Sequence, residues 1–427
     1  MSAPEAAVPP QRDTEFTIAV LPDTQNYIDY THQTAEGFPF DASEMFLDQM
    51  QYVAENLVSV GGEIAFVTSL GDVWQHPTLL IDEGHAARGF RRAASPVMDQ
   101  YFAPTEETLT VEMPTAHEGF ALIAGKTPFS VVPGNHDYDA TWVDSKFPPK
   151  AMTREEADPD DPLAFGMLHP GGLDNFRAVF GADTPFFKDQ PWYVASHDGG
   201  ADSAQIFSAG GYRFLHIGLQ FDPPDASLEW AASVMQAHKG LPTIISTHDY
   251  MNRFGERIPS RTLDGHAVDP IDNSPEMIWD KLIRQNDQVF LVLCGHQLGQ
   301  GLRVDDNVQG HKVWQVLSDY QDRKQTAIEA GRPDTPIGDG WMRLMTFDMA
   351  GPVPLIRVKT YSTHYHALSR DTAQYAKWYK QAEKPDLTDE AFNDEDDFVM
   401  ELEGFRERFE SARLLTTVMV SGAQSGK

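Results

Sequence analysis

Five positions in this sequence place a metal-binding type of side chain just after a short apolar run. Their carboxylate, amide and imidazole groups together suit divalent or trivalent Mn, Fe or Zn. The positions are Asp23, Asp72, Asn135 with its neighbour His136, His248 and His296. A single Asp or His after a strand is more often a turn residue or a helix cap. Five of them in the same structural place favour a metal site over a set of unrelated caps.

The apolar runs that precede these residues predict buried β-strands. They occupy 16–21, 64–70, 129–132, 243–246 and 289–294, and each ends in turn formers or polar residues. Short apolar runs with such boundaries are typical of buried strands. Helical patterns at 44–58 and 230–238 fall between them. Strands that alternate with helices predict an α/β fold, in which ligands collect beyond the C-terminal ends of the strands.

The rest of the chain is predicted to add further strands, two inserts and a tail. Segments 312–317, 341–347 and 355–360 resemble successive strands, which favours an antiparallel or mixed sheet in the second half. Inserts at about 75–127, with a helix and a short strand pair, and at 138–211 should overhang the strand ends. We expect residues 1–13 to be disordered, 14–370 to form the catalytic body and 371–427 to form an acidic helical extension. Phe398, Leu402, Phe405 and Phe409 have the spacing of one terminal helix docked on the body.

The composition limits the kinds of partner. Of 427 residues, 64 are acidic and 33 basic, for a formal charge of −31. Nucleic acid and anionic membranes are disfavoured as partners, because their binding depends on Lys and Arg. No stretch approaches the roughly 18 apolar residues of a membrane span, and Cys294, the single cysteine, excludes an internal disulfide. We expect a soluble protein, and the sequence does not determine its oligomeric state. No signal peptide is visible, although an exported chain that begins at its mature end would look the same.

The ordered motifs resemble the calcineurin-like metallophosphoesterase superfamily. They are Leu21-Pro22-Asp23-Thr24-Gln25, Gly71-Asp72, Gly134-Asn135-His136-Asp137, His248 and Gly295-His296. The first motif is similar to that of a bacterial branch of the superfamily. Further similarity, including Asp319-Tyr320-Gln321, extends the resemblance over about residues 16–365.

The resemblance implies a four-layer sandwich of two mixed β-sheets flanked by helices, with two metal ions at the strand ends. Asp72 would bridge the two ions. One ion would be completed by Asn135, His248 and His296, and the other by Asp23 with Gln25. Two such cations can lower the pKa of a shared water and hold the attacking and leaving oxygens of an in-line displacement.

The implied reaction is hydrolysis of a small phosphoric ester, with a phosphodiester favoured. A metal-activated hydroxide would attack phosphorus in line, and His136 would stand beside the phosphate as general acid or transition-state stabiliser. Asp137 would orient the His136 ring from behind.

Two departures from the family pattern weaken the Asp23 side. The superfamily usually has His where this chain has Gln25, whose amide oxygen is a weaker ligand. The last motif usually continues Gly-His-x-His, but here Leu298 takes the place of the second His and cannot coordinate metal. We therefore expect one tight ion and one weak or substrate-assisted ion.

Other functions stay open at this stage. A degenerate, single-metal module that binds a phosphoester without turnover is the competing hypothesis, favoured by Leu298. A phosphomonoesterase is a second alternative. His76, four residues after Asp72, is a candidate to face the site, whereas His216 in an apolar run is expected to be a hydrogen-bonded core residue.

Overall fold

Strand β1 (Glu15–Leu21) has apolar residues on both faces, and the two faces enter different cores. Phe16, Ile18 and Val20 belong to a core shared with a second sheet, whereas Ala19 and Leu21 pack in a core with helix α2 (Ser43–Glu55). Because the side chains of a strand alternate between its faces, a continuous apolar run indicates burial on both sides. The strand predicted at 16–21 is therefore confirmed, and it lies between a helical layer and another sheet.

The computed structural model describes residues 14–414, so the disorder expected for 1–13 and the end of the expected extension, 415–427, lie outside the described residues. The first sheet has the order β15-β14-β13-β1-β2-β3, with β16 also paired to β14. Neighbours β1, β2 and β3 are parallel, and β13 runs antiparallel to β1. The other strands of this sheet are β2 (Ile64–Ser69), β3 (Phe129–Val131), β13 (Trp341–Asp348), β14 (Leu355–Ser362), β15 (Ala367–Leu368) and β16 (Asp397–Glu401).

The second sheet is also mixed and has the order β11-β12-β10-β9-β8-β7-β6. Its centre is parallel, from β8 through β9 and β10 to β12, and its edges are antiparallel. Its strands are β6 (Tyr193–His197), β7 (Asp202–Ala209), β8 (Tyr212–Gly218), β9 (Thr243–Ser246), β10 (Val289–Cys294), β11 (Gly299–Asp306) and β12 (Lys312–Asp319). A separate hairpin joins β4 (Ala140–Val143) to β5 (Leu168–Gly171).

Helices flank the two sheets, and two of the helices predicted from the sequence, α2 and α7, are present. Besides α2, the α-helices are α1 (Gln25–Ile28), α3 (Glu83–Arg88), α4 (Pro96–Tyr101), α5 (Met113–Ala121), α6 (Asp174–Phe180), α7 (Asp225–Ala237), α8 (Gly265–Val268), α9 (Pro275–Ile278), α10 (Gln325–Glu329), α11 (Tyr375–Glu383), α12 (Asp389–Asp394) and α13 (Phe405–Arg408). Two π-helical segments, η4 (Thr108–Glu112) and η7 (Trp279–Ile283), precede α5 and follow α9. Short 3₁₀ turns occur at η1 (Tyr30–His32), η2 (Thr34–Glu36), η3 (Val58–Val60), η5 (Asn135–Asp137), η6 (Asp198–Gly200), η8 (Ser369–Asp371) and η9 (Glu410–Ala412).

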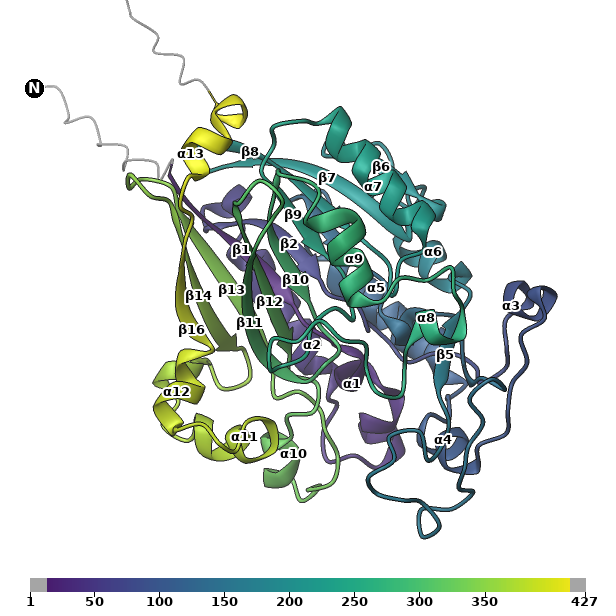
Figure 1. Ribbon diagram of the computed structural model, residues 1–427. Coiled ribbons are helices and arrows are strands. Elements are labelled where there is room, and N and C mark those ends of the chain that lie inside the picture. Colours follow the sequence, from purple (N-terminus) through teal and green to yellow (C-terminus); the bar gives the residue numbers. More distant parts are fainter. Residues whose placement is uncertain (1–13, 415–427) are drawn as a thin grey trace, which may run out of the picture.

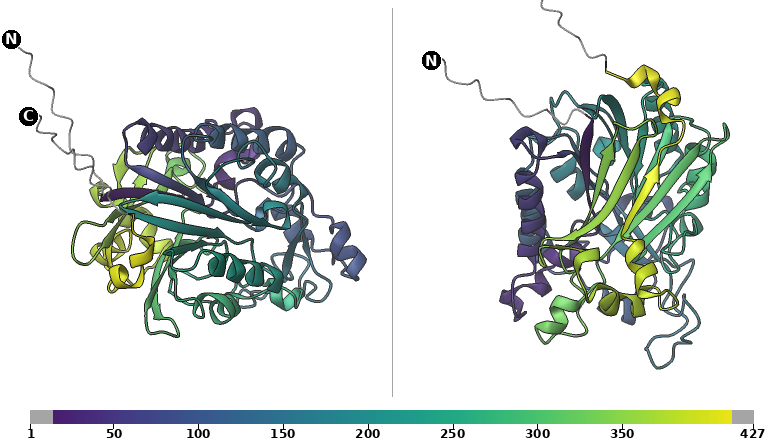
Figure 2. Two further views of the ribbon diagram at one scale, coloured as in Figure 1. Left: turned by 90° about the horizontal axis from the view of Figure 1, so that it is seen from above. Right: turned by 90° about the vertical axis from the view of Figure 1, so that its left-hand side faces the viewer.

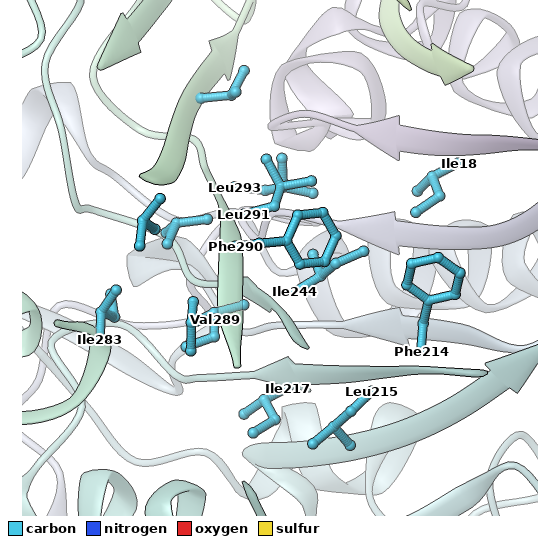
Figure 3. Close-up of a cluster of buried hydrophobic side chains, with 14 of the residues drawn as sticks. Ile18, Phe214, Leu215, Ile217, Ile244, Ile283, Val289, Phe290, Leu291 and Leu293 are labelled. Atoms are coloured by element: carbon cyan, nitrogen blue, oxygen red, sulfur yellow. The ribbon is translucent and has the colours of Figure 1, made fainter. Parts of the chain in front are cut away.

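The main core lies between the two sheets. Phe16 of β1 packs against Phe214 of β8 with ring centroids 5.4 Å apart, and Phe66 of β2 stacks on Phe207 of β7 at 4.5 Å. Figure 3 shows Ile18 of the first sheet close to strands of the second sheet within this cluster. The molecule is thus a mixed α/β sandwich, and its two sheets are seen in Figures 1 and 2.

Three sequence-based expectations are wrong in detail. The second insert does not run to 211, because β6 and β7 belong to the second sheet. The first insert forms helices α3, α4 and α5 rather than a strand pair; its residues Thr78 and Arg92 make isolated bridges to the hairpin strand β4 and the residue after it. The expected terminal helix over 398–409 is split, since Phe398 lies in strand β16 and α13 begins only at Phe405.

Between residues 14 and 414, no helix is both long and apolar enough to cross a membrane.

Candidate metal centre

Residues that follow four strands, two from each sheet, or lie close to their ends, meet at one point. Nε2 of His248, after β9, lies 3.2 Å from Oδ1 of Asp72, after β2. The same nitrogen is 3.1 Å from Oδ1 of Asn135, after β3. The ring of His296, after β10, has its centroid 4.9 Å from that of His248. The structure thus brings together Asp72, Asn135, His248 and His296, the set that the resemblance implies for one ion. Single ligand atoms of Asp72, His248 and His296 all lie within 4.8 Å of one another.

The protonation of His248 is fixed by its backbone partner. Its Nδ1 lies 2.7 Å from the carbonyl oxygen of Leu70, which can only accept, so Nδ1 carries the proton. In the neutral ring Nε2 then presents a lone pair to the side-chain oxygens of Asp72 and Asn135. Three acceptor atoms that converge in this way require a cation or a second proton between them.

The electrostatics of the site attract positive charge. Burial alone would lower the pKa of His248, but the negative charges of Asp72 and Asp23 outweigh it and raise that pKa to about 10. Burial, with the positive charge of His248 second, lowers the pKa of His296 to about 3. His296 therefore keeps a free lone pair at neutral pH, and a metal ion would be held by the same charge that attracts the proton to His248.

Buried polar atoms without a partner supply a test of whether these residues fit a metal. Nδ1 of His296, Nδ1 of His136 and Oε1 of Gln25 are each buried and form no hydrogen bond within residues 14–414. Such orphaned atoms are costly unless something binds them. An imidazole nitrogen and an amide oxygen are ordinary ligands for Mn, Fe or Zn, so the donor set fits the expected ions.

The Asp23 side of the site is built differently. Both carboxylate oxygens of Asp23 accept from the backbone N–H of His296, at 3.3 and 3.1 Å. Nε2 of Gln25 donates to Oδ2 of Asp72 at 3.3 Å and contacts Oε1 of Gln321. Nε2 of Gln321 donates in turn to Oδ2 of Asp23 at 3.4 Å. Neutral amide donors thus cover carboxylate oxygens on the side where the second ion was expected to bind weakly.

Gln321 and Asp319 belong to the site, although in the sequence they stand out only as part of the family resemblance. Asp319 ends β12 and accepts from the backbone N–H of Leu298 at 2.9 Å and of Gln321 at 3.0 Å. Burial, with several bonds opposing it, raises the pKa of Asp319 to about 6. The sequence carried a signal for Asp319, because the segment that forms β12 is another apolar run that ends in a carboxylate.

Close approach of backbones explains two glycines of the motifs. A Cβ on Gly134 would lie 2.3 Å from Oδ1 of Asp72, and a Cβ on Gly295 would lie 2.2 Å from Oδ1 of Asp23. Asp72 and His296 have left-handed φ values of 50° and 69°. Such conformations cost free energy in non-glycine residues and concentrate at functional sites.

The orienting role expected for Asp137 is not found. Its Oδ2 accepts from the N–H of Gly134 at 2.8 Å, and its Oδ1 accepts from that of Val73 at 2.8 Å. The carboxylate therefore ties the Asp72 loop to the Asn135 loop instead of contacting the His136 ring. His136 is itself anchored by its backbone N–H, which donates to Oδ1 of Asp72 at 2.8 Å.

A cleft of about 350 Å³ reaches the edge of the candidate centre, where Gln25, one of the expected ligands, forms part of its wall. His136, Gln25 and Gln321 line it, together with residues of the first insert. His76 faces this region as the sequence suggested: its ring centroid lies 5.5 Å from that of His136, and its Nε2 contacts the carbonyl oxygen of Phe102 at 2.9 Å. His216 is a buried core residue, bonded to Gln205 and Ser246.

Comparison with known proteins adds a distant relative. The chain is 22% identical over 363 residues to YvnB, an uncharacterized protein of Bacillus subtilis (strain 168). The match covers 84% of this chain and 20% of YvnB, so the chain spans about a fifth of the length of this curated relative. No family model matches the chain.

Proposed function

We propose that the protein is a metal-dependent phosphoric ester hydrolase of the calcineurin-like metallophosphoesterase type, acting on a small phosphodiester. The observation that carries the proposal is the convergence of Nε2 of His248 with side-chain oxygens of Asp72 and Asn135, at 3.2 and 3.1 Å. That arrangement favours a bound cation. When bound, such cations neutralise a phosphate and lower the pKa of a water molecule beside it.

The chain's own residues would bind and orient the ester. Buried carboxylates alone would repel an anionic phosphate, so a bound cation would have to supply the positive charge that holds the ester. The His136 ring lines the cleft and lies beside the metal-binding residues, where it can hold a phosphate oxygen or give a proton to the leaving group. The buried ring of His76 packs beside the His136 ring, with centroids 5.5 Å apart, and lines the same cleft.

A binding module without turnover is the alternative that Leu298 supports. Leu298 cannot act as a ligand, and it lines a separate cavity with Arg323 and Tyr379. The amide contacts of Gln321 on the Asp23 side also leave room for a centre with a single ion.

Release of p-nitrophenol from its bis ester, with added Mn²⁺, tests the proposal. We expect turnover by the full chain and none by the Asp72→Ala variant. The monoester, p-nitrophenyl phosphate, measured in parallel, separates a diesterase from a monoesterase. Binding of inorganic phosphate without hydrolysis of either ester would support the binding module instead.

A further inference from the structure

A second group of metal-ligand side chains lies away from the site described above. It consists of His85 in helix α3, His169 in strand β5 and Asp269, the residue that follows helix α8. One ligand atom from each lies within 4.8 Å of the others. His169 and Asp269 are 2% and 1% exposed. Helix α3, strand β5 and helix α8 lie on the same side of the molecule (Figure 1).

The distances in this cluster match the edges of a metal tetrahedron. Nε2 of His85 is 3.2 Å from Nε2 of His169 and 3.7 Å from Oδ2 of Asp269. With metal–nitrogen bonds of about 2.0–2.1 Å, neighbouring ligands of a tetrahedral zinc ion are roughly 3.3–3.4 Å apart. A zinc ion would therefore fit between these atoms after small side-chain movements.

The His85 ring is already held in the form that binds metal. Oδ2 of Asp82 lies 2.6 Å from Nδ1 of His85 and accepts a hydrogen bond from it. The lone pair of Nε2 is then directed at His169. A carboxylate behind a ligating imidazole is the usual support of a zinc ligand. Gly171 makes room for the pair, because a Cβ there would lie 2.0 Å from Oδ2 of Asp82.

One further buried atom lacks a partner. Nδ1 of His169 forms no hydrogen bond within the described part of the chain, whereas Oδ2 of Asp269 has an ion-pair partner. The guanidinium of Arg88 lies 2.5 Å from Oδ2 of Asp269, and its side chain is 40% exposed. In the absence of metal, Arg88 offsets the charge of Asp269, and it can turn outward when a cation enters.

We propose that His85, His169 and Asp269 form a structural zinc site, with water as a fourth ligand. The site would join the first insert, the β4–β5 hairpin and the segment after β9 into one unit. This proposal does not depend on the proposed hydrolase activity, because none of its three ligands belongs to the candidate metal centre.

Zinc content of the full chain, with the first centre removed by the paired substitutions Asp72→Ala and His248→Ala, tests this site. After dialysis against metal-free buffer and reloading with one equivalent of Zn²⁺, we expect one zinc per chain and a rise in Tm. Co²⁺ in its place should give the visible absorption of a tetrahedral ion. Adding His169→Ala should abolish both, and Asp82→Asn should weaken zinc binding 10–100-fold.

A matched control is His311→Ala. This substitution removes an imidazole outside the cluster that also contacts a carboxylate, Oδ1 of Asp287 at 2.6 Å. This variant should bind zinc normally. If His169→Ala does not fold, Asp269→Asn serves in its place. Two outcomes would overturn the proposal in favour of a hydrogen bond between two neutral imidazoles. One is a folded chain without the first centre that takes up no zinc. The other is zinc binding that is equally strong after His169→Ala or Asp269→Asn.

Discussion

Oδ1 of Asn135 lies 3.1 Å from Nε2 of His248, and in the neutral imidazole neither atom can donate to the other. The proton of His248 is engaged with the carbonyl oxygen of Leu70 at 2.7 Å. A cation between Asn135 and His248 would resolve the contact, with the carboxylate oxygen of Asp72 as its third neighbour. The relationship ties the loop after β3 in the first sheet to the loop after β9 in the second.

Removal of either charged partner should release the ion. We expect Asp72→Ala and His248→Ala to lower metal affinity by more than about 100-fold, because even the outer partners of metal ligands contribute 10–100-fold. Hydrolysis should be lost with the metal. Metal analysis after gel filtration, combined with the bis-ester assay, checks this; a variant that keeps both its metal and its turnover would contradict the assignment.

His136→Ala should separate chemistry from metal binding. The His136 ring forms no hydrogen bond within residues 14–414 and lines the cleft, so its loss should leave the metal in place. We expect a roughly 10²–10⁴-fold decrease in kcat, the range typical of a missing general acid. Metal content of the purified variant is the control, and unchanged turnover would refute the role.

The number of tight ions follows from the amide contacts on the Asp23 side. Since Gln25 and Gln321 donate to carboxylate oxygens there, we expect one tight Mn²⁺ and a second only at high concentration. Electron paramagnetic resonance of the Mn²⁺-loaded protein should then show an isolated ion. A spin-coupled pair of Mn²⁺ ions at one equivalent of metal would contradict this expectation. Repeating the titration with the His169→Ala variant removes any contribution of the cluster of His85, His169 and Asp269 to the number of bound ions.

Glu112 should make stability depend on pH. Burial, followed by the charge of Asp29, raises the pKa of Glu112 to about 8, although its oxygens accept backbone bonds from Tyr30 and Gln75 at 3.0 Å. The folded state therefore holds a proton that the unfolded chain has lost above about pH 4.5, so stability falls as the pH rises from 4.5 to 8.

We expect this loss to be at least about 1.4 kcal/mol, the equivalent of one pKa unit. Glu112→Gln removes the titrating group at a pH-independent cost, because the amide of Gln has one oxygen and cannot accept both backbone bonds. Chemical denaturation at pH 5 and pH 8 compares the two proteins. Equal differences between the two pH values in wild type and variant would count against this explanation.

Asp396 should matter more for stability than any exposed carboxylate of the tail. It is fully buried and accepts from Arg343 at 2.9 Å and from the hydroxyls of Tyr320 and Tyr375 at 2.8 and 2.6 Å. Asp396→Ala would leave a buried guanidinium unpaired, at a cost of about 3–5 kcal/mol. The matched control is Asp394→Ala, which breaks an exposed pair with Arg370 and should cost less than about 1 kcal/mol.

The strands were predictable where apolar runs end in polar residues. Strands β2 and β10 are bounded in this way, and so their ends gave Asp72 and His296 directly. The local sequence could not show that Gln321 would cover Asp23, because that contact joins residues 298 positions apart. Asp137 was misjudged for a related reason: its neighbour in sequence is His136, but its partners are the backbone N–H groups of Gly134 in its own loop and of Val73 in the Asp72 loop.

The tail shows a different limit of periodicity. Phe398 and Phe405 fit one helical face, yet Gly404 has a left-handed φ of 70° and separates β16 from α13. Phe398 therefore follows the period of a strand, with Met400 buried two residues later. Apolar spacing alone could not reveal this change of element, because the i, i+4, i+7, i+11 spacing of the four residues is that of one helical face.

Strand β16 has a practical consequence for anyone who wishes to produce a shorter version of this protein. It pairs with β14 from Leu355↔Glu401 to Lys359↔Asp397, so a recombinant fragment that stops at residue 370 would expose the backbone groups of β14 to solvent. Bare strand edges invite intermolecular pairing, and such a fragment should precipitate or form inclusion bodies. Expression trials should therefore retain the chain through at least residue 414.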